Sequence, residues 1–161
     1  MAWTTPKTWV DNVDVLSATN LNTHVRDNLK ALTEWTAYTP TWTATGGTPT
    51  IGNGSLTGRY IKAGNLCHFT VRLALGSTSS LGTTTQWAWA LPFTATASSV
   101  ASVFIYDVGN AYFVGAAPIT SGASAFGIIT DSLSTGIGYL QPMTWSAANG
   151  DNMTVSGTYE C

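Results

Sequence analysis

The chain has 161 residues, of which 44% are hydrophobic and 9% are charged, and its formal net charge is −2. Soluble domains usually contain about 25% charged residues, so this composition excludes disorder driven by charge, and the net negative charge argues against a nucleic-acid partner. The polar surface must come from hydroxyl groups, because the sequence contains 27 Thr and 14 Ser. Threonine suits the surface of a sheet, so the composition predicts a mainly β protein.

The sequence predicts neither secretion nor insertion into a membrane. Residues 1–7 lack the apolar core of a signal peptide, and no apolar run reaches the roughly 18 residues of a membrane-spanning helix. Cys67 and Cys161 do not make a disulfide framework without a secretion signal, so we expect two free thiols.

Residues 1–35 form the predicted N-terminal arm and helix. The arm contains Trp3 and Trp9, which we expect either to fold back on the domain or to anchor the protein to a partner surface. Residues 17–35 carry the one convincing helical pattern, with Ser17 as its N-cap. A helix of this length is marginal on its own in water, so it must pack against something.

The helix also shows the spacing of a coiled-coil seam. The predicted seam consists of Leu21, Val25, Asn28 and Leu32. Two interpretations stay open: the helix packs on its own β-domain, or identical helices form a small parallel bundle. In a bundle, Asn28 would set the register and the number of chains. If Asn28 faces solvent instead, Leu29 would define the buried stripe.

Strand and turn signals dominate residues 36–161, which we predict to be a β-domain. The clearest pattern is a hairpin at residues 57–75 with its turn at Gly64 and Asn65. Alternation beyond this turn places Cys67 in the core and His68 on the outer face. Further strands are expected at residues 38–44, 87–91, 100–107, 112–117, 126–131, 137–141, 143–146 and 153–159.

Two local signals refine this picture. Asn53 and Gly54 predict a hairpin between Ile51 and Leu56, and Pro40 argues for an edge position. Roughly nine or ten short strands, separated by turns, predict a jelly-roll-like antiparallel sandwich, preceded by the arm and one α-helix.

The sequence contains no catalytic signature. The acidic residues of the β-domain are Asp107, Asp131, Asp151 and Glu160, and no spacing among them indicates the carboxylate pair of a glycan-degrading enzyme. His24 and His68 are too few for a metal site. We therefore expect a protein that is not an enzyme and that needs neither a cofactor nor a metal.

Aromatic residues of the β-domain leave one alternative open. Trp87 and Trp89 lie on one face of their predicted strand, and we interpret them first as core residues. The rival interpretation is a platform on which sugar rings stack, with Tyr112 as a further candidate.

Residues 3–9 and 21–32 resemble the N-terminus of small virion surface proteins of tailed bacteriophages, particularly those of actinobacteria. Residues 38–42 and 51–60 look like the β-domain attached to such starts, and residues 145–159 are similar to the last strands of phage fibre heads.

This resemblance implies a homotrimer on the virion surface, made in the host cytoplasm. Residues 1–35 would hold the major capsid protein or a tail protein, with Trp3 and Trp9 at the attachment, and residues 36–161 would face outward. The expected role is capsid decoration or a head fibre. The alternative is a minor tail or fibre protein whose β-domain binds host-surface glycan.

Overall fold

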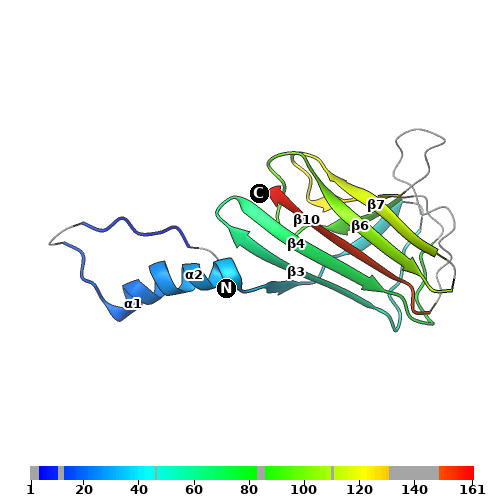
Figure 1. The fold of residues 1–161 in the computed structure, drawn as a ribbon, viewed down its shortest axis with the longest axis horizontal. Helices are drawn as coiled ribbons and strands as arrows, with labels where there is room; N and C mark the ends of the chain where they lie inside the picture. Colours follow the sequence, from blue (N-terminus) through cyan, green and yellow to red (C-terminus); the bar gives the residue numbers. More distant parts are fainter. Residues whose placement is uncertain (1–3, 11–12, 46, 83–85, 110, 131–148) are drawn as a thin grey trace.

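The computed structural model describes residues 4–10, 13–45, 47–82, 86–109, 111–130 and 149–161. An N-terminal arm and a helix extend away from a β-domain, as Figure 1 shows. The last strand of the β-domain, β10, runs through the middle of its larger sheet.

One continuous helix contains a π-helical turn. It consists of α1 (Ala18–Leu21), the π segment η1 (Asn22–Arg26) and α2 (Asp27–Thr33). Within the π turn, the Asp27 amide donates to the Asn22 carbonyl. A π turn inserts an extra residue into the helix and changes the direction of the side chains that follow. The regular spacing assumed for the seam therefore does not hold through this turn.

The predicted N-cap of the helix is confirmed. The Ser17 hydroxyl accepts a hydrogen bond of 3.2 Å from the Asn20 amide, which satisfies a donor in the first turn. The helix ends where Glu34 adopts an extended backbone, with φ −103° and ψ 127°. The chain then enters the first strand of the β-domain.

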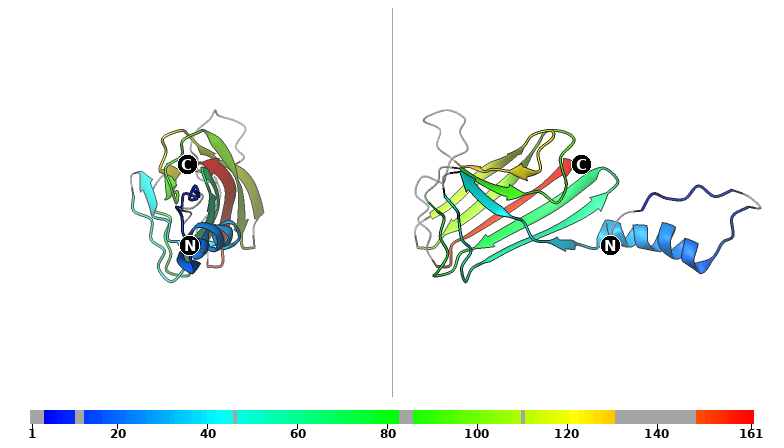
Figure 2. Two further views of the ribbon diagram at one scale, coloured as in Figure 1. Left: turned by 90° about the vertical axis from the view of Figure 1, so that its left-hand side faces the viewer. Right: turned by 180° about the vertical axis from the view of Figure 1, so that it is seen from behind.

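Among the described residues, ten strands form two antiparallel sheets, so the prediction of a mainly β protein is confirmed. The strands are β1 (Thr36–Tyr38), β2 (Trp42–Thr45), β3 (Ser55–Ala63), β4 (Leu66–Ala74), β5 (Gln86–Ala90), β6 (Ser99–Asp107), β7 (Ala111–Ile119), β8 (Ala125–Phe126), β9 (Ile129–Thr130) and β10 (Asn152–Glu160). The larger sheet has the order β1-β3-β4-β10-β6-β7-β9 and the smaller one β2-β5-β8. In Figure 2, seen end-on, the long strands curve around the interior and β2 lies opposite them. The jelly-roll detail stays a prediction.

The predicted hairpin at residues 57–75 forms as β3 and β4. Its turn contains Gly64 at φ +59°, in the left-handed region that glycine adopts without strain. On β4, Cys67, Phe69 and Val71 are completely buried, as the alternation predicts. Strand β10 pairs with the other edge of β4. These positions therefore lie at the centre of the larger sheet.

Two strand predictions differ from the structure. Residues 38–44 form two strands, because the chain leaves the larger sheet around the buried Pro40 and enters the smaller sheet. Both β1 and β2 are edge strands, as Pro40 suggested. Residues 126–131 likewise divide between β8 and β9, which belong to different sheets. The strands expected at residues 137–141 and 143–146 lie outside the described residues.

The turn at Asn53 and Gly54 does not join a hairpin. The Gly54 amide donates to the Ile51 carbonyl at 2.9 Å, so a turn is present. However, Thr50 bridges to Ser80, and β3 pairs with β1 and β4. The predicted pairing of Ile51 with Leu56 is therefore wrong, since the long-range partners replace the local one.

Aromatic rings fill the interior between the sheets. Trp89 is completely buried and stacks on Trp42 and on Phe126, each at 6.0 Å between ring centroids. Trp42 comes from β2 and Phe126 from β8, so the smaller sheet is held together by these rings as well as by its hydrogen bonds. The buried residues of both sheets form one core cluster.

Candidate functional site

The arm is held against the helix by a pair of backbone hydrogen bonds to Asn28. The Asn28 side chain accepts from the Thr4 amide and donates to the Thr4 carbonyl, both at 2.9 Å. The same side chain donates to the His24 carbonyl at 3.2 Å, and Asn28 is only 5% exposed. Its polar atoms are thus satisfied within one chain.

A second contact closes the outer part of the arm. Lys7 forms an ion pair with Asp14, and the Asp14 carboxylate accepts from the Val10 amide at 2.7 Å. The hydrogen bond from Lys7, and then that from Val10, hold the pKa of Asp14 below its usual value of 3.8. The arm is therefore folded on itself before it reaches the helix.

Large apolar side chains of the helix stay exposed. Leu21, Val25, Leu29 and Leu32 are 41%, 44%, 60% and 42% exposed, and we call these four residues the helix stripe. An apolar hollow of about 170 Å³ lies beside the stripe and is lined by Pro6, His24, Val25, Asn28, Leu29 and Leu32. The helix projects from the β-domain in both Figure 1 and Figure 2. Pro6 of the arm lies beside the stripe, whose four side chains nevertheless stay 41–60% exposed.

These positions revise the predicted seam. Leu21, Val25 and Leu32 are exposed as a contact surface requires, but Asn28 is covered by the arm and bonded to Thr4. Asn28 therefore cannot face a helix of another chain without displacing the arm, and Leu29 takes its place in the stripe. Of the helix, the α2 part contacts β3 of the β-domain, while the helix as a whole projects from that domain.

The helix meets the β-domain through Trp35. The Arg59 guanidinium lies 4.5 Å from the centre of the Trp35 ring, and the His68 ring lies 5.3 Å from it. Arg59 and His68 belong to the outer faces of β3 and β4. These two contacts of Trp35 join the C-terminal end of the helix to the larger sheet, where α2 also contacts β3.

The two predicted attachment residues have different outcomes. Trp3 lies outside the described residues. Trp9 is 39% exposed, and the Lys7 ammonium lies 5.2 Å from the centre of its ring. Trp9 does not fold back on the β-domain, so its role in attachment stays a prediction.

The sugar-stacking interpretation needs a correction at two positions. Trp87 is 4% exposed and Trp89 is 0% exposed, and the Trp87 indole donates to the Leu81 carbonyl at 3.0 Å. Neither ring has a face open to solvent, because both lie in the interior between the sheets. They are core residues, as the first interpretation had it, and they cannot stack on a sugar.

Tyr112 lies on the outer face of the larger sheet and is 70% exposed. Its ring stacks on Tyr106 at 4.9 Å and on Phe104 at 5.9 Å between centroids. Val114 on the same strand is also 70% exposed. Sequence reasoning missed Phe104 and Tyr106, because the pairing of β6 with its neighbouring strands must be known before one can tell which face of β6 points outward.

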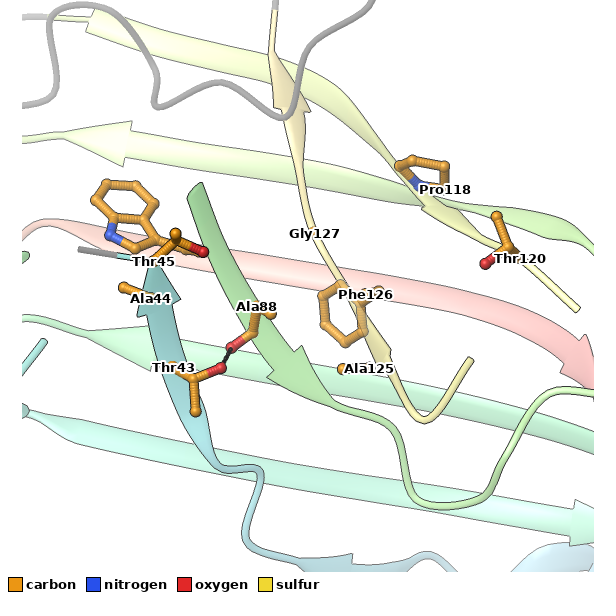
Figure 3. A pocket seen from close by; sticks show the side chains of 10 residues that line it. Thr43, Ala44, Thr45, Ala88, Pro118, Thr120, Ala125, Phe126 and Gly127 are labelled. Carbon is orange, nitrogen blue, oxygen red and sulfur yellow. Dashed lines mark hydrogen bonds between the residues drawn. The ribbon is translucent and has the colours of Figure 1, made fainter. Parts of the chain in front are cut away.

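Figure 3 shows a hollow of about 300 Å³ beside the smaller sheet. Thr43 on β2 donates to the Ala88 carbonyl on β5 at 3.4 Å, Phe126 comes from β8, and Pro118 and Thr120 lie at the end of β7. The described residues that line this hollow supply hydroxyl groups and apolar surface.

The acids singled out in the sequence hold turns. Asp107 and Asp151 are 3% and 0% exposed, and the Asp151 carboxylate accepts from the Val108 amide at 2.8 Å. Asp131 lies outside the described residues. His68 bonds to Thr158 at 3.0 Å on the outer face. In the described part of the chain, no three potential metal ligands gather at one place.

Both cysteines are free thiols, as expected. Burial raises the pKa of Cys67 to about 11, so this thiol stays neutral at physiological pH. Cys161 at the chain end is half-buried, and the Lys62 ammonium donates to its sulfur at 3.1 Å. A reactive nucleophile needs a lowered pKa, so Cys67 has the opposite of a catalytic environment.

Taken together, these features define a class: a mainly β protein of two antiparallel sheets from which an apolar-faced helix projects. No helix among the described residues has the length and apolar character to cross a membrane. Comparisons with protein-family models, curated proteins and solved structures find no match to this chain.

Proposed function

We propose that the protein is a structural protein of a bacteriophage virion. It forms a homotrimer that decorates the capsid, or a short fibre, anchored by its arm and helix with the β-domain outward. The observation that carries this proposal is the helix stripe, because a projecting helix with four exposed apolar side chains requires a partner.

Association through the stripe is energetically reasonable. Burying a Leu or Val side chain completely contributes roughly 1.5–3 kcal/mol, and each stripe residue has about half of that still to gain. Identical helices around one axis would cover the stripes of all chains at once, and closed symmetry limits further growth. The Nδ1 atom of His24, buried beside the stripe without a hydrogen-bond partner among the described residues, would lie close to such an axis.

The location on a virion rests on the resemblance of residues 3–9 and 21–32 to phage virion proteins. The capsid is favoured over the tail because the described chain has one helix and one β-domain, with no long shaft between them. The exposed Trp9 suits an anchor on the major capsid protein or a tail protein, since large aromatic groups dominate interfaces.

The first experiment measures the mass of the full-length protein in solution by light scattering. We expect three times the chain mass of 16.9 kDa for the native protein. Replacing both Val25 and Leu29 by Asp places charges in the stripe and should give the mass of a single chain. The matched control is Leu66→Asp, at an apolar position 50% exposed on β4, which should stay trimeric. A native protein that remains a single chain contradicts the trimer.

The second experiment tests attachment. Virions of the phage that encodes the chain are imaged by cryo-electron microscopy with the β-domain labelled, and label on the capsid surface is expected. Trp9→Ala should reduce the amount of bound protein while leaving the trimer mass unchanged, because Trp9 lies outside the stripe. Unlabelled virions, or Trp9→Ala protein that binds fully, contradict the attachment role.

A further inference from the structure

The outer face of the larger sheet carries two neighbouring hollows, which we together call the trough. Strands β3, β4, β10, β6 and β7 lie side by side, as Figure 1 shows. Two hollows open on this face, one of about 520 Å³ over β3 and β4 and one of about 400 Å³ over β10, β6 and β7. Thr154 on β10 lines both hollows, so they meet at this residue.

The register of the strands places opposite chemistries at the two ends of the trough. Thr154 is the partner of Arg72 on β4 and of Phe104 on β6. Neighbouring strands are about 4.8 Å apart, so Arg72 and Phe104 stand roughly 10 Å apart along one row. One extended ligand can therefore touch both.

The β3–β4 end of the trough is positively charged. Arg59 and Arg72 are both exposed and line this hollow. Neither takes part in the ion pairs found among the described residues, which involve Lys7, Arg26 and Lys30. Arg59 is paired with Thr70 and Arg72 with Thr57, so the two arginines occupy diagonal positions on neighbouring strands. In a chain of net charge −2, these two exposed arginines form a local site for an anion, since a guanidinium binds carboxylate or phosphate through paired hydrogen bonds.

The β6–β7 end presents aromatic rings beside small residues. Phe104 is 43% exposed and stacks on Tyr112, and Val114 lies directly opposite Phe104. Ser102 and Gly115 line the hollow next to them. Because Ser102 has a small side chain, the Phe104 ring forms an aromatic wall beside an open part of the hollow, against which the apolar face of a sugar ring can pack.

Hydroxyl groups connect the two ends. Thr70 and Ser156 share a hydrogen bond of 3.3 Å, and Thr57 and Thr154 lie in the neighbouring row. Such groups both donate and accept hydrogen bonds, so they suit the hydroxyls of a sugar chain. Among the described residues, no carboxylate lines either hollow, so the side chains that line the trough do not repel an acidic ligand.

We propose that this trough binds an acidic glycan, a sugar chain that carries carboxylate or phosphate groups. The anionic group binds at Arg59 and Arg72, the neighbouring hydroxyls bind to the Thr and Ser residues of β4 and β10, and a sugar ring packs against Phe104. Charge complementarity and the aromatic wall together favour this ligand over a neutral glycan. The site lies within one β-domain and does not depend on the trimer or on attachment to a virion.

Binding is tested on the full-length protein by isothermal titration calorimetry with defined probes. Polygalacturonate and hyaluronan carry carboxylates, and glycerol-phosphate and ribitol-phosphate teichoic acids carry phosphates. Dextran is the neutral control, and oligothymidylate is an anionic polymer without the sugar surface. We expect binding to one of the two acidic groups, which also identifies the anion, and affinities at least about tenfold weaker for dextran and oligothymidylate.

Two variants locate the site. Arg72→Gln removes a charge-assisted contact, and Phe104→Ala removes the ring; each should weaken binding of the same glycan by about tenfold or more. The matched controls are Arg26→Gln, an exposed arginine of the helix, and Val100→Ala, an exposed apolar residue on β6 outside both hollows. Both controls should bind as the native protein does.

Three results would overturn the proposal. The first is the absence of binding to all four acidic glycans. The second is binding that Arg72→Gln and Phe104→Ala leave unchanged, or that oligothymidylate matches in affinity. The third is a Phe104→Ala protein with a lower solution mass than the native one, which would show that this face joins two copies of the chain.

Discussion

The helix and the β-domain place their large apolar side chains in opposite environments. In the β-domain, large apolar side chains face inward, and Phe69, Val71 and Trp89 are completely buried. On the helix, the largest apolar side chains face outward, and Leu29 is 60% exposed. The same chain forms a well-packed core in its β-domain, so the exposure of the helix side chains does not reflect an inability of this chain to bury apolar residues.

The β-domain has its packing and hydrogen-bond partners within the chain, whereas the helix leaves an apolar surface without a partner in the described part of the chain. Every central strand of the β-domain has its hydrogen-bond partners and a core on its inner face. Among the described residues, the helix contacts the arm, through Thr4 and Asn28, and strand β3, and the neighbouring Trp35 contacts the sheet. The β-domain is therefore expected to hold its own fold, and the helix to depend on partners.

The largest expected effect comes from removing a core ring. Trp89→Ala should lower the free energy of unfolding of the β-domain by roughly 3–5 kcal/mol, since it empties the space between Trp42 and Phe126. Leu29→Ala, in the helix stripe, should change it by about 0.5 kcal/mol or less in dilute solution. Urea denaturation followed by circular dichroism measures both, and equal losses would show that the two regions unfold as one.

A smaller effect is expected where two strands approach closely inside the β-domain. A Cβ added at Gly157 would clash with the Ala101 Cβ, so Gly157→Ala should lower the unfolding free energy by roughly 1–3 kcal/mol. Ala101→Gly in the same chain removes the nearest clashing atom and should recover part of the loss. A Gly157→Ala protein as stable as the native one in urea would contradict this packing.

The arm is expected to respond to one side chain. Asn28→Ala removes both hydrogen bonds to Thr4 and should loosen the arm by about 1 kcal/mol, since the Thr4 backbone can turn to water instead. Hydrogen exchange at the Thr4 amide should then become faster, while exchange in the β-domain stays the same. Asn22→Ala on the same helix is the control. An unchanged exchange rate at the Thr4 amide would contradict the hydrogen bonds between Asn28 and Thr4.

The smallest expected effects concern pH, because the stability of the arm and that of the β-domain should depend on it in different ranges. The pKa of Asp14 is lowered, so its contribution to the arm is present above its unfolded value of 3.8 and is lost as the pH falls below it. The pKa of Cys67 is raised to about 11, so its contribution to the β-domain is present below the unfolded value of 9.0 and is lost between there and 11.

Acid should therefore loosen the arm first, and alkali the β-domain. Hydrogen exchange at the Val10 amide should speed up below pH 3.8 while the core remains protected. The urea midpoint of the β-domain should fall between pH 9.0 and about 11, and it should fall less in Cys67→Ala. A β-domain that loosens in acid before the arm, or an arm that loosens in alkali before the β-domain, would contradict the environments assigned to Asp14 and Cys67.

Local patterns in the sequence determined much of this molecule. The hairpin of β3 and β4 follows from the turn at Gly64 and from alternation along β4, which are properties of neighbouring residues. Ser17 caps the helix because its hydroxyl reaches an amide only three residues away. The high Thr content and low charge indicated sheets with a polar, uncharged surface. These features need no knowledge of distant partners.

Only the tertiary structure decided the features that depend on distant partners. The split of residues 38–44 between two sheets, and the burial of Trp87 and Trp89, follow from how the sheets face each other. The side-chain amide of Asn28 is bonded to the backbone of Thr4, which lies 24 residues earlier, and this contact could not be predicted from the helix sequence.

The trough shows the same limit most clearly. Arg72, Thr154 and Phe104 come from three strands and stand in one row only because β10 pairs with both β4 and β6. Each strand shows by alternation which side chains share a face, but strand order and register come from long-range hydrogen bonds and core packing. Alternation therefore predicts which residues point outward, and pairing decides which of them meet.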